Sequence, residues 1–534
     1  MEPPITDSER RAARAETSPD WVRDTVFYAI DVARFRDSDG DGFGDLPGLI
    51  EKFDYLEELG VGCLWFLPFY PSARRDNGYD VTDYYGVDPR MGTLEDFQRL
   101  TTEAHARGIR VMVDLVAHHT SEKHPWFEAA RADRGSRFHD YYVWSYEEPT
   151  TSPEESVFPE EERGIWSYSR HADAWYRHRF YSFQPDLRIA NDAVWASILG
   201  VVDFWIAMGV DAFRIDAATH LFEDKGVEGG TARLDERMDA LRSYLAERAP
   251  GVALVGEADV ATSAIPPYFE RGRFDSLYNF LANNTLFLSL ARESAEPLGE
   301  CLAGLHDEVP DGTWLNFVRN LDELDLEQLR PEDRAEVRDH FAPDDDMRIY
   351  GRGIRRGWAP MMRGEAQLRM TMSLLFAPPG APLLAYGHEI GIGENLAAEG
   401  RKAVRIPMQW SAERHGGFTR EGRSGITDAA QPRGRYGYRR RNVEAQRGDP
   451  QSLLTLTREL ISLRRDHPSI GGSPWQLRAE GPLLWLAYGP LTAVHNLSRR
   501  HQRVEAVESQ RRLLGDDLSA GRIPGYGLCW FMAE

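Results

Sequence analysis

The chain has 534 residues, of which 42% are hydrophobic and 11% aromatic, and its 63 Lys and Arg against 85 Asp and Glu give a formal charge of −22. The length exceeds that of one ordinary domain, and the apolar content excludes a largely disordered chain. The acidic balance disfavours nucleic acid and anionic membranes as partners, but it places no restriction on a neutral substrate.

The chain begins with a segment, up to about residue 20, that lacks the apolar core of a signal peptide and that we expect to be a disordered leader. No apolar run approaches the length of a membrane span. The three cysteines are widely spaced and predict neither a disulfide framework nor a cysteine-based metal site. We therefore expect a cytoplasmic protein with no membrane partner, and we leave its oligomeric state open.

Eight apolar, strand-like runs follow between Trp21 and Gly387, and helical stretches separate most of them. Strand alternating with helix in this way predicts an α/β fold, a (β/α)₈ TIM barrel. The sixth run fits least well because its apolar alternation is ragged. The predicted strands are 26–30, 62–67, 110–116, 210–216, 252–257, 274–280, 314–320 and 382–386, and the predicted helices are 46–59, 94–107, 194–208, 233–248 and 364–375.

Two connections of the barrel are too long to be simple loops. The third is rich in Tyr, Trp, Glu, Ser and Pro and predicts a small inserted domain, and the eighth, from residue 389 to about 446, is expected to form part of the pocket wall. A final helix over 452–467 and strand-like runs over 483–488 and 491–496 predict a small antiparallel β domain. The expected domains are a leader 1–20, a barrel 21–116 and 192–468, an inserted domain 117–191 and a C-terminal β domain 469–534.

Three acids follow strand-like runs at their carboxyl ends: Asp216, Glu257 and Asp322. A parallel barrel brings such residues to one rim, and two close carboxylates can cleave a glycosidic bond with retention of configuration. Arg214, two positions before Asp216, favours an ionised Asp216, whereas Glu257 has no adjacent cation in sequence, which suits a proton donor. Helix capping would explain any one acid equally well, but three acids at three strand ends weigh against it.

Several motifs around these acids resemble the α-amylase family, glycoside hydrolase family thirteen. The four regions of that family resemble D-L-V-A-H-H (114–119), D-A-F-R-I-D-A-A-T-H (211–220), V-G-E-A (255–258) and F-V-R-N-L-D-E (317–323). Q-P-D-L (184–187) is similar to the extra motif of the oligo-glucosidase branch. Three further motifs resemble the trehalose synthase group of that branch, the maltose–trehalose isomerases. They are G-I-R-R-G-W-A-P (353–360), R-I-P-M-Q-W (405–410) and N-V-E-A-Q-R-G-D-P (442–450).

The resemblance implies the barrel fold and a role for each acid: Asp216 as nucleophile, Glu257 as acid/base and Asp322 as transition-state stabiliser. It implies a small α-glucoside such as maltose or trehalose as substrate. An Asp80–Arg401 pair is expected to wall off the pocket and favour attack at a chain end. Simple packing would also explain Tyr79, and a solvated surface position would explain Arg401. The residues implied to line the subsite for the transferred glucosyl unit are Tyr79, Asp80, His119, Arg214 and Arg401.

The sequence D-S-D-G-D-G-F-G-D over 37–45 has acids at alternate positions followed by glycine, as in an EF-hand loop. The twelfth position is Gly48 rather than glutamate, so the loop is not a complete EF-hand. An acidic glycine-rich turn without an ion is the alternative. The family resemblance implies instead a single Ca²⁺ loop whose ligands are Asp37, Asp39, Asp41, the Phe43 carbonyl and Asp45.

The chain departs from the family pattern near the expected barrel mouth. Leu321 stands where the family usually carries a His that hydrogen-bonds the sugar, and His118, Arg188 and His388 replace Asn, Asn and Asp. A leucine offers shape but no hydrogen bond, so we expect Leu321 to face the substrate and to alter which sugar is preferred without abolishing the three-acid chemistry.

Three interpretations therefore remain. The first is a retaining α-glucosyl enzyme that interconverts maltose and trehalose, and the second applies the same residues to hydrolysis or transfer of another small α-glucoside. The third is a non-catalytic homologue that binds carbohydrate or a partner. The presence of all three acids and of Arg214 weakens the third interpretation.

Overall fold

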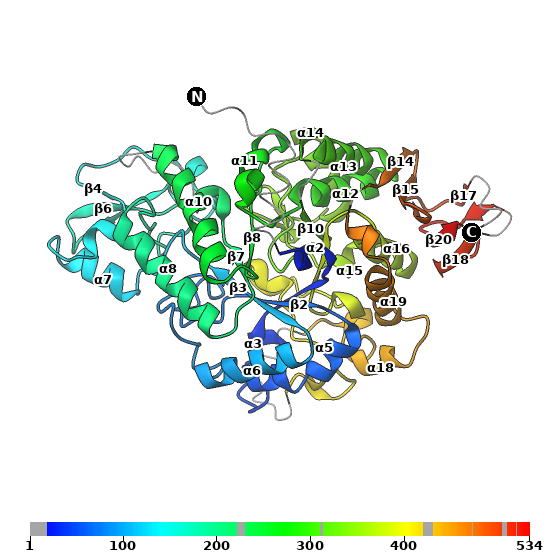
Figure 1. Ribbon diagram of the computed structural model, residues 1–534, viewed down its shortest axis with the longest axis horizontal. Coiled ribbons are helices and arrows are strands. Elements are labelled where there is room, and N and C mark those ends of the chain that lie inside the picture. Colours follow the sequence, from blue (N-terminus) through cyan, green and yellow to red (C-terminus); the bar gives the residue numbers. More distant parts are fainter. Residues whose placement is uncertain are drawn as a thin grey trace. The chain divides into compact units, whose positions relative to one another are not determined.

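The computed structural model describes residues 19–221, 230–309, 313–419, 431–472, 474–504, 510–518 and 521–533. The leader predicted up to about residue 20 therefore lies almost entirely outside the described residues. Eight parallel strands close into a barrel in the order β1-β13-β10-β9-β8-β7-β3-β2 (Figure 1). These strands are β1 Phe27–Ile30, β2 Cys63–Phe66, β3 Arg110–Leu115, β7 Ala212–Ile215, β8 Ala253–Gly256, β9 Ser276–Tyr278, β10 Trp314–Phe317 and β13 Ala381–Ala385.

The closed barrel confirms the predicted fold class, and each of the eight predicted strands corresponds to one strand of the barrel. The sixth, β9, is also the shortest, with 3 residues. β7 and β8 are buried at every position, as expected for parallel strands covered on both faces. The register places Asp114 of β3 opposite Arg214 of β7, and Arg214 opposite Val255 of β8. Charged side chains on neighbouring strands are thus brought together by the barrel itself.

The chain forms two compact units, which are described separately. One contains Trp65–Ala258 and Pro267–Leu277. Its helix α6 begins with a reciprocal capping box between Thr93 and Asp96, and Phe97, Leu100 and Ala104 form its buried face. The main helices of this unit are α6 Leu94–Ala106, α7 Pro125–Ala132, α8 Asp192–Ala207, α10 Gly230–Arg248 and α11 Pro266–Phe269.

The long connection after β3 carries its own small sheet. Its order is β4-β6-β5, and both strand pairs are antiparallel. The strands are β4 Trp144–Ser145, β5 Trp166–Ser169 and β6 Ala174–Arg177. A hydrophobic group centred on Phe127 of α7 packs on this sheet, with Tyr142, Trp144 and Tyr176 around the Phe127 ring. The aromatic content of this segment therefore serves a local core.

The other unit contains Asp20–Leu64, Asp259–Pro266 and Tyr278–Glu534. The helix predicted over 46–59 is wrong in one respect: it is two helices, because Lys52 has φ −109° and ψ 7°, outside the α region. The main helices are α2 Trp21–Asp24, α3 Val32–Phe35, α4 Leu46–Ile50, α5 Phe53–Leu59, α12 Phe280–Arg292, α13 Glu296–Glu308, α14 Pro331–Phe341, α15 Trp358–Met361, α16 Glu365–Phe376, α18 Val443–Arg447 and α19 Leu453–Asp466.

Several of these helices are absent from the sequence prediction, and the longest of them are α12 and α13, with 13 residues each. α12 is buried around most of its circumference, so it lacks the one-sided apolar pattern that signals a helix. α13 contains glycines, and Gly299 is where it approaches β14: a Cβ added there would lie 2.6 Å from the Cβ of Ala479. Close packing of helix on sheet, rather than local propensity, explains the residue at this position.

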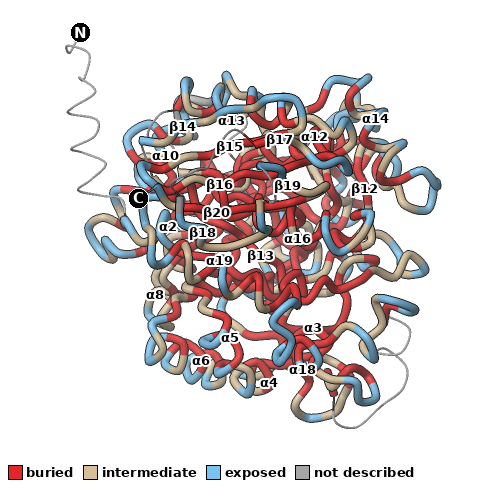
Figure 2. Tube along the Cα trace, turned by 90° about the vertical axis from the view of Figure 1, so that its right-hand side faces the viewer, coloured by how far each residue is buried: buried red, intermediate tan, exposed pale blue. Residues whose placement is uncertain are grey.

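The C-terminal segment forms an antiparallel sheet in the order β14-β15-β16-β20-β18, as predicted. It is tied to α16 through Ser373, whose hydroxyl contacts the His495 ring at 2.8 Å and accepts from the Trp530 indole N–H at 2.8 Å. Figure 2 shows β16 and α16 buried along most of their length. The strands are β14 Gln476–Glu480, β15 Leu483–Tyr488, β16 Leu491–Asn496, β18 Gln510–Gly515 and β20 Leu528–Ala533. None of the helices within the described ranges combines the length and apolarity that crossing a bilayer requires.

Candidate active site

One buried guanidinium, that of Arg214 in β7, contacts three carboxylates of the first unit. Its Nη1 donates to Asp114 Oδ1 at 2.7 Å and to Asp216 Oδ1 at 2.5 Å. Its Nη2 lies 2.6 Å from Glu257 Oε1. Asp216 and Glu257 directly follow β7 and β8, so two of the three predicted acids meet at neighbouring strand ends.

The surroundings of Arg214 determine which of these groups carry charge. Burial lowers the pKa of the guanidinium, but Asp114, Glu257 and the other nearby groups raise it well above the usual value, so Arg214 stays cationic. Burial raises the pKa of Asp114 to about 7 against the lowering effect of Arg214, and the charges of Asp216 and Glu257 add to the rise. One cation facing three carboxylates leaves an excess of negative charge, and Asp114 takes up a proton near neutral pH.

The environment expected for Glu257 is wrong in one respect. The sequence suggested a glutamate without a neighbouring cation, whereas its Oε1 is ion-paired with Arg214. The two residues lie on adjacent strands, a proximity that sequence adjacency does not reveal. The other oxygen, Oε2, accepts from the backbone N–H of Ala217 at 3.0 Å. Glu257 is thus held at both oxygens beside the residue that follows Asp216.

The backbone is strained immediately after Asp216. Ala217 has a φ of 47°, in the left-handed region that residues other than glycine rarely adopt. This conformation costs on the order of 1–2 kcal/mol and is held by the Glu257 contact and by the N–H of Ala218, which donates to the Glu257 carbonyl at 2.9 Å. The strained turn fixes the direction in which the Asp216 side chain leaves β7.

Tyr79 and His119, both predicted to line a subsite, extend this group. The Tyr79 hydroxyl accepts from Arg214 Nη1 at 3.3 Å and donates to Asp114 Oδ2 at 3.5 Å. The His119 Nε2 lies 3.2 Å from the Tyr79 carbonyl oxygen. Tyr79 is therefore part of the polar network rather than simple packing.

Asp80, the next predicted residue, is fully buried. Burial raises its pKa, although it accepts from the backbone N–H groups of Arg75 and Asp76 at 3.2 and 3.3 Å and from the Ser72 hydroxyl at 3.3 Å. Local backbone donors thus fix this carboxylate. Its predicted pairing with Arg401 stays a prediction.

The Q-P-D-L motif packs against the D-L-V-A-H-H motif. Asp186 forms an ion pair with Arg177, and its Oδ1 lies 3.4 Å from His118 Nδ1. His118 Nδ1 is also 3.3 Å from His119 Nδ1, and the Leu187 N–H donates to the His118 carbonyl at 2.8 Å. The unusual His118 is thus built into a buried network beside His119.

In the second unit, Asp322 is held by two arginines of the eighth connection. Arg405 donates from Nη2 to Asp322 Oδ1 at 2.7 Å and from Nε to the Leu321 carbonyl at 2.9 Å. Arg401 Nη1 lies 3.4 Å from the same Asp322 oxygen. Leu321 is buried. The carboxylate predicted as a stabiliser therefore has a fixed, cation-paired orientation.

Arg401 makes its shortest contacts with Glu323. Its Nε and Nη2 donate to the two Glu323 oxygens at 2.5 and 3.0 Å, a bidentate pair. Its side chain is only 16% exposed, so the alternative of a solvated surface cation is wrong.

Arg319 holds the backbone around Asp322 through hydrogen bonds to carbonyl oxygens. Arg319 donates to the carbonyl oxygens of Asp322 at 2.7 Å and of Arg356 at 3.0 Å, and burial lowers its pKa to about 10. Burial also lowers the pKa of His388 to about 3, with Arg319 adding to the effect, and its ring packs against Trp358 at 5.4 Å. His388 is thus a neutral, packed side chain.

The glycine-rich loop brings three of its predicted metal ligands together. Carboxylate oxygens of Asp37, Asp39 and Asp45 lie within 4.8 Å of one another. Asp41 instead accepts from the Phe43 N–H at 2.7 Å and is not part of this group. Asp37 is fully buried and burial raises the pKa of Asp45, so two of the three carboxylates are poorly solvated.

Three residues of the site were not predicted individually. Asp114 contacts Arg214, Arg405 contacts Asp322, and Glu323 contacts Arg401. Asp114 and Arg405 open the motifs D-L-V-A-H-H and R-I-P-M-Q-W, and Glu323 closes F-V-R-N-L-D-E, so each motif contained the signal. Their partners, however, lie as far as 100 positions away in sequence for Asp114 and 83 for Arg405. Only the folded barrel supplies those pairings.

The geometry supports acid–base and nucleophilic chemistry by carboxylates. Asp216 is 7% exposed and paired with a cation, the state of a carboxylate able to act as a nucleophile. Glu257 retains 22% exposure of its side chain, so it is accessible for proton exchange with a ligand.

Comparison with known proteins gives a consistent result. The family profile described as "Alpha amylase, catalytic domain" matches residues 30–472. Trehalose synthase/amylase from Mycobacterium tuberculosis (strain H37Rv) is 37% identical over 97% of this chain and 91% of its own length. Trehalose synthase from Pimelobacter sp. (strain R48) is 37% identical over 91% of this chain and 89% of its own. The crystal structure of an α-amylase from H. orenii has a TM-score of 0.77 and 28% identity, covering 96% of this chain and 99% of that one.

Proposed function

The chain belongs to the α-amylase family, and from that premise we propose that it is a retaining α-glucosyl enzyme that interconverts maltose and trehalose. The observation that carries the proposal is the shared guanidinium of Arg214, which contacts both Asp216 and Glu257 at neighbouring strand ends. Two relatives that are 37% identical over nearly the whole chain are trehalose synthases, which supports this pair of substrates.

In the proposed mechanism, Asp216 attacks the anomeric carbon of the glucosyl unit while Glu257 protonates the departing glycosidic oxygen. The ion pair with Arg214 favours an ionised nucleophile. Glu257 then removes a proton from the anomeric hydroxyl of the released glucose. That oxygen attacks the anomeric carbon from the face that the leaving group occupied, opposite the ester bond, and Asp216 departs as a carboxylate. Two inversions give net retention, and the new linkage joins two anomeric carbons.

Glu257 must be protonated at the start of this cycle, yet it is ion-paired with Arg214. Three carboxylates compete for the single guanidinium of Arg214. Substrate binding beside Asp216 would remove water there and strengthen the ion pair between Asp216 and Arg214. Weakening of the Arg214–Glu257 contact would free Glu257 Oε1 for the glycosidic oxygen when the acid is needed.

Asp322 is proposed to bind sugar hydroxyls and to stabilise positive charge on the anomeric carbon, with Arg405 fixing its orientation. Tyr79, Asp80, His119 and Arg401 complete the proposed glucosyl subsite. The most direct test of the substrates is incubation with maltose, trehalose and sucrose followed by identification of every product. Conversion of maltose to trehalose and back is expected, and turnover of sucrose alone would reject the proposed pair of substrates.

A second candidate function is hydrolysis or transfer of another small α-glucoside. The buried Leu321 beside Asp322 favours it, because an apolar wall cannot pair with a sugar hydroxyl. Substituting Leu321 therefore tests the choice of substrate without changing any of the three acids.

We expect Leu321→His to raise turnover of maltose and to weaken use of the preferred substrate. A hydrogen bond to an uncharged hydroxyl contributes roughly 0.5–1.5 kcal/mol, so the change in kcat/KM should be about three- to tenfold. Steady-state kinetics on maltose, trehalose and a panel of α-glucosides measures it, with the volume-matched Leu321→Met as control. Equal activity of all three proteins across the panel would remove the specificity role.

The proposal includes a structural Ca²⁺ at the loop 37–45. Three carboxylates within 4.8 Å, two of them poorly solvated, form a donor set of the kind that Ca²⁺ prefers. Asp37, Asp39 and Asp45 would hold the ion, with Asp41 and the Phe43 carbonyl as further candidates. Its contribution would be electrostatic, stabilising the loop between α3 and α4.

Chelation is expected to lower the melting temperature by about 2–5 °C, because an ion that binds only the native state stabilises it by mass action. Calorimetry with and without chelator measures the shift, and re-added Ca²⁺ should restore it. Asp39→Asn serves as the matched variant and should be less sensitive to the chelator. A chelator-insensitive melting temperature in protein shown to be metal-free by elemental analysis would rule the ion out.

The remaining parts of the proposal follow the sequence expectations. They are the domain boundaries given above, a cytoplasmic location, and a small α-glucoside such as maltose or trehalose as the binding partner.

A further inference from the structure

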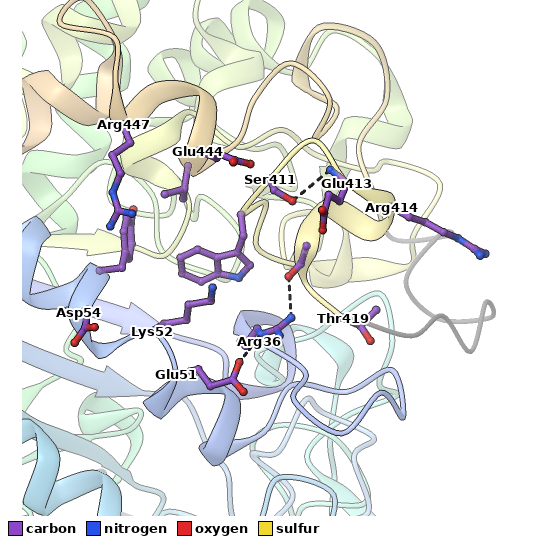
Figure 3. Close-up of a pocket in the computed structure, with 14 residues that line it drawn as sticks. Arg36, Glu51, Lys52, Asp54, Ser411, Glu413, Arg414, Thr419, Glu444 and Arg447 are labelled. Atoms are coloured by element: carbon purple, nitrogen blue, oxygen red, sulfur yellow. Dashed lines mark hydrogen bonds and ion pairs between the residues drawn. The ribbon is translucent and has the colours of Figure 1, made fainter.

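A pocket outside the acid clusters lies in the second unit, between α4, α5, the segment 410–419 and α18. Its volume is about 740 Å³, within the range of small-molecule sites. Figure 3 shows the lining side chains, which come from the residues that follow α4, from α5, from the segment 410–419 and from α18. Neither the Arg214 group nor the Asp322 group contributes to its lining.

One wall of the pocket is fixed by Arg36. This guanidinium is buried, with its side chain 5% exposed. It donates to the carbonyl oxygens of Gly417 and Phe418 at 2.9 Å each, and from Nε to Glu51 at 3.2 Å (Figure 3). These bonds join α4 to the segment 410–419, so the two sides of the pocket are held in place before any ligand arrives.

A second part of the lining is aromatic and equally constrained. The Trp410 indole donates to the Phe35 carbonyl at 2.8 Å and meets the Tyr55 ring edge-on at 5.1 Å. Tyr55 is in turn fixed by its hydroxyl, which donates to Glu389 at 2.7 Å. Lys52 Nζ lies over the Trp410 ring, 4.4 Å from its centroid. A ligand would therefore meet an apolar ring edge with ammonium N–H donors beside it.

The charges around the pocket are balanced. Its carboxylates are Glu51, Asp54, Glu413 and Glu444, and its cations are Arg36, Lys52, Arg414 and Arg447. Equal numbers of both signs give no net attraction for an anion or a cation. They do supply many acceptors and many donors at once, which is what a dense set of hydroxyl groups requires.

From this combination we propose that the pocket is a second binding site for a neutral polyhydroxylated ligand in the size class of a disaccharide. Sugar hydroxyls would pair with the mixed carboxylates and cations, and C–H groups of the sugar would contact the exposed edge of Trp410 beside Lys52. Phosphorylated sugars and nucleotides would gain no net attraction from their negative charge, because four carboxylates match the four cations of the lining. Binding at this pocket takes place away from the acids and does not depend on which reaction they catalyse.

The test uses the full chain carrying Asp216→Asn, so that the probe is not consumed, with 5-fluorotryptophan in place of tryptophan. Among the 14 tryptophans, the Trp410 resonance is identified by its loss in Trp410→Phe. Trehalose is titrated, and the ¹⁹F shift of Trp410 is expected to saturate. A Trp410 resonance that stays unchanged up to the solubility limit of trehalose overturns the proposal.

Paired variants separate this pocket from any distant effect. Asp54→Ala combined with Glu444→Ala removes two exposed acceptors of the lining and should weaken the Trp410 titration by about tenfold. Glu57→Ala, on the same helix α5 but outside the lining, should leave the midpoint unchanged. An unchanged midpoint in the double variant overturns the assignment. Saturation by inorganic phosphate in place of trehalose overturns the ligand class.

Discussion

Asp216→Asn and Glu257→Gln are each expected to lower kcat on maltose by at least about 10⁴-fold while the protein stays folded. The neutral Asn cannot form the glucosyl ester, and Gln cannot donate and recover a proton at the glycosidic oxygen. Arg214 keeps two of its three carboxylate partners in either variant, so the buried cation remains compensated. Steady-state kinetics together with thermal unfolding measures both parts of the prediction.

The matched control is Asp211→Asn, at the other end of the strand that leads to Asp216. Asp211 accepts from the Val111 N–H at 2.8 Å, a contact that the Asn amide oxygen preserves. Near-parental activity is expected for this variant. If Asp216→Asn or Glu257→Gln behaves like the control, the role assigned to that acid is wrong.

Arg214→Ala is expected to have the largest effect on stability, about 3–5 kcal/mol at pH 7.5. The substitution leaves Asp114, Asp216 and Glu257 without the cation that compensates them in the interior. Burial already raises the pKa of Asp114 against the lowering effect of Arg214, so without that cation the native-state pKa of Asp114 should rise further above its unfolded value. Groups with raised native pKa bind protons more tightly when folded, so the loss of stability should shrink as pH falls from 7.5 to 5.

Urea denaturation of the parent and the variant at both pH values measures this difference. Arg214→Lys is the comparison, since it restores one cation but cannot reach three carboxylates at once, and its loss should be intermediate. A destabilisation that is the same at pH 5 and pH 7.5 would show that lost packing, rather than uncompensated charge, dominates at this position.

The barrel could be predicted because its signal is local. Each strand is a short apolar run, and the alternation with helices survives even where one run, at Ser276–Tyr278, is only 3 residues long. α12 could not be found in the same way, because a helix buried on most sides loses the one-sided pattern. Gly299 in α13 reads as a helix breaker until the approach of Ala479 is known.

The acids could be predicted as well, because a residue that ends a barrel strand must lie at the rim. Their partners could not. The ion pair between Arg214 and Glu257 depends on strand order, and the bond from Arg405 to Asp322 joins positions 83 apart. The same limit explains the mistaken environment of Glu257: charge compensation in a barrel comes from the neighbouring strand and not from the neighbouring residue.

The central claim is that the Asp216–Glu257 pair transfers an α-glucosyl unit with retention. The most direct measurement follows the anomeric protons by NMR from the first turnovers of maltose. Double displacement predicts a first transfer product in which the glucosyl unit keeps the α configuration, as in α,α-linked trehalose. Where water is the acceptor, α-glucose should appear before its β anomer. A β-configured first product would contradict the double displacement and the roles of both acids.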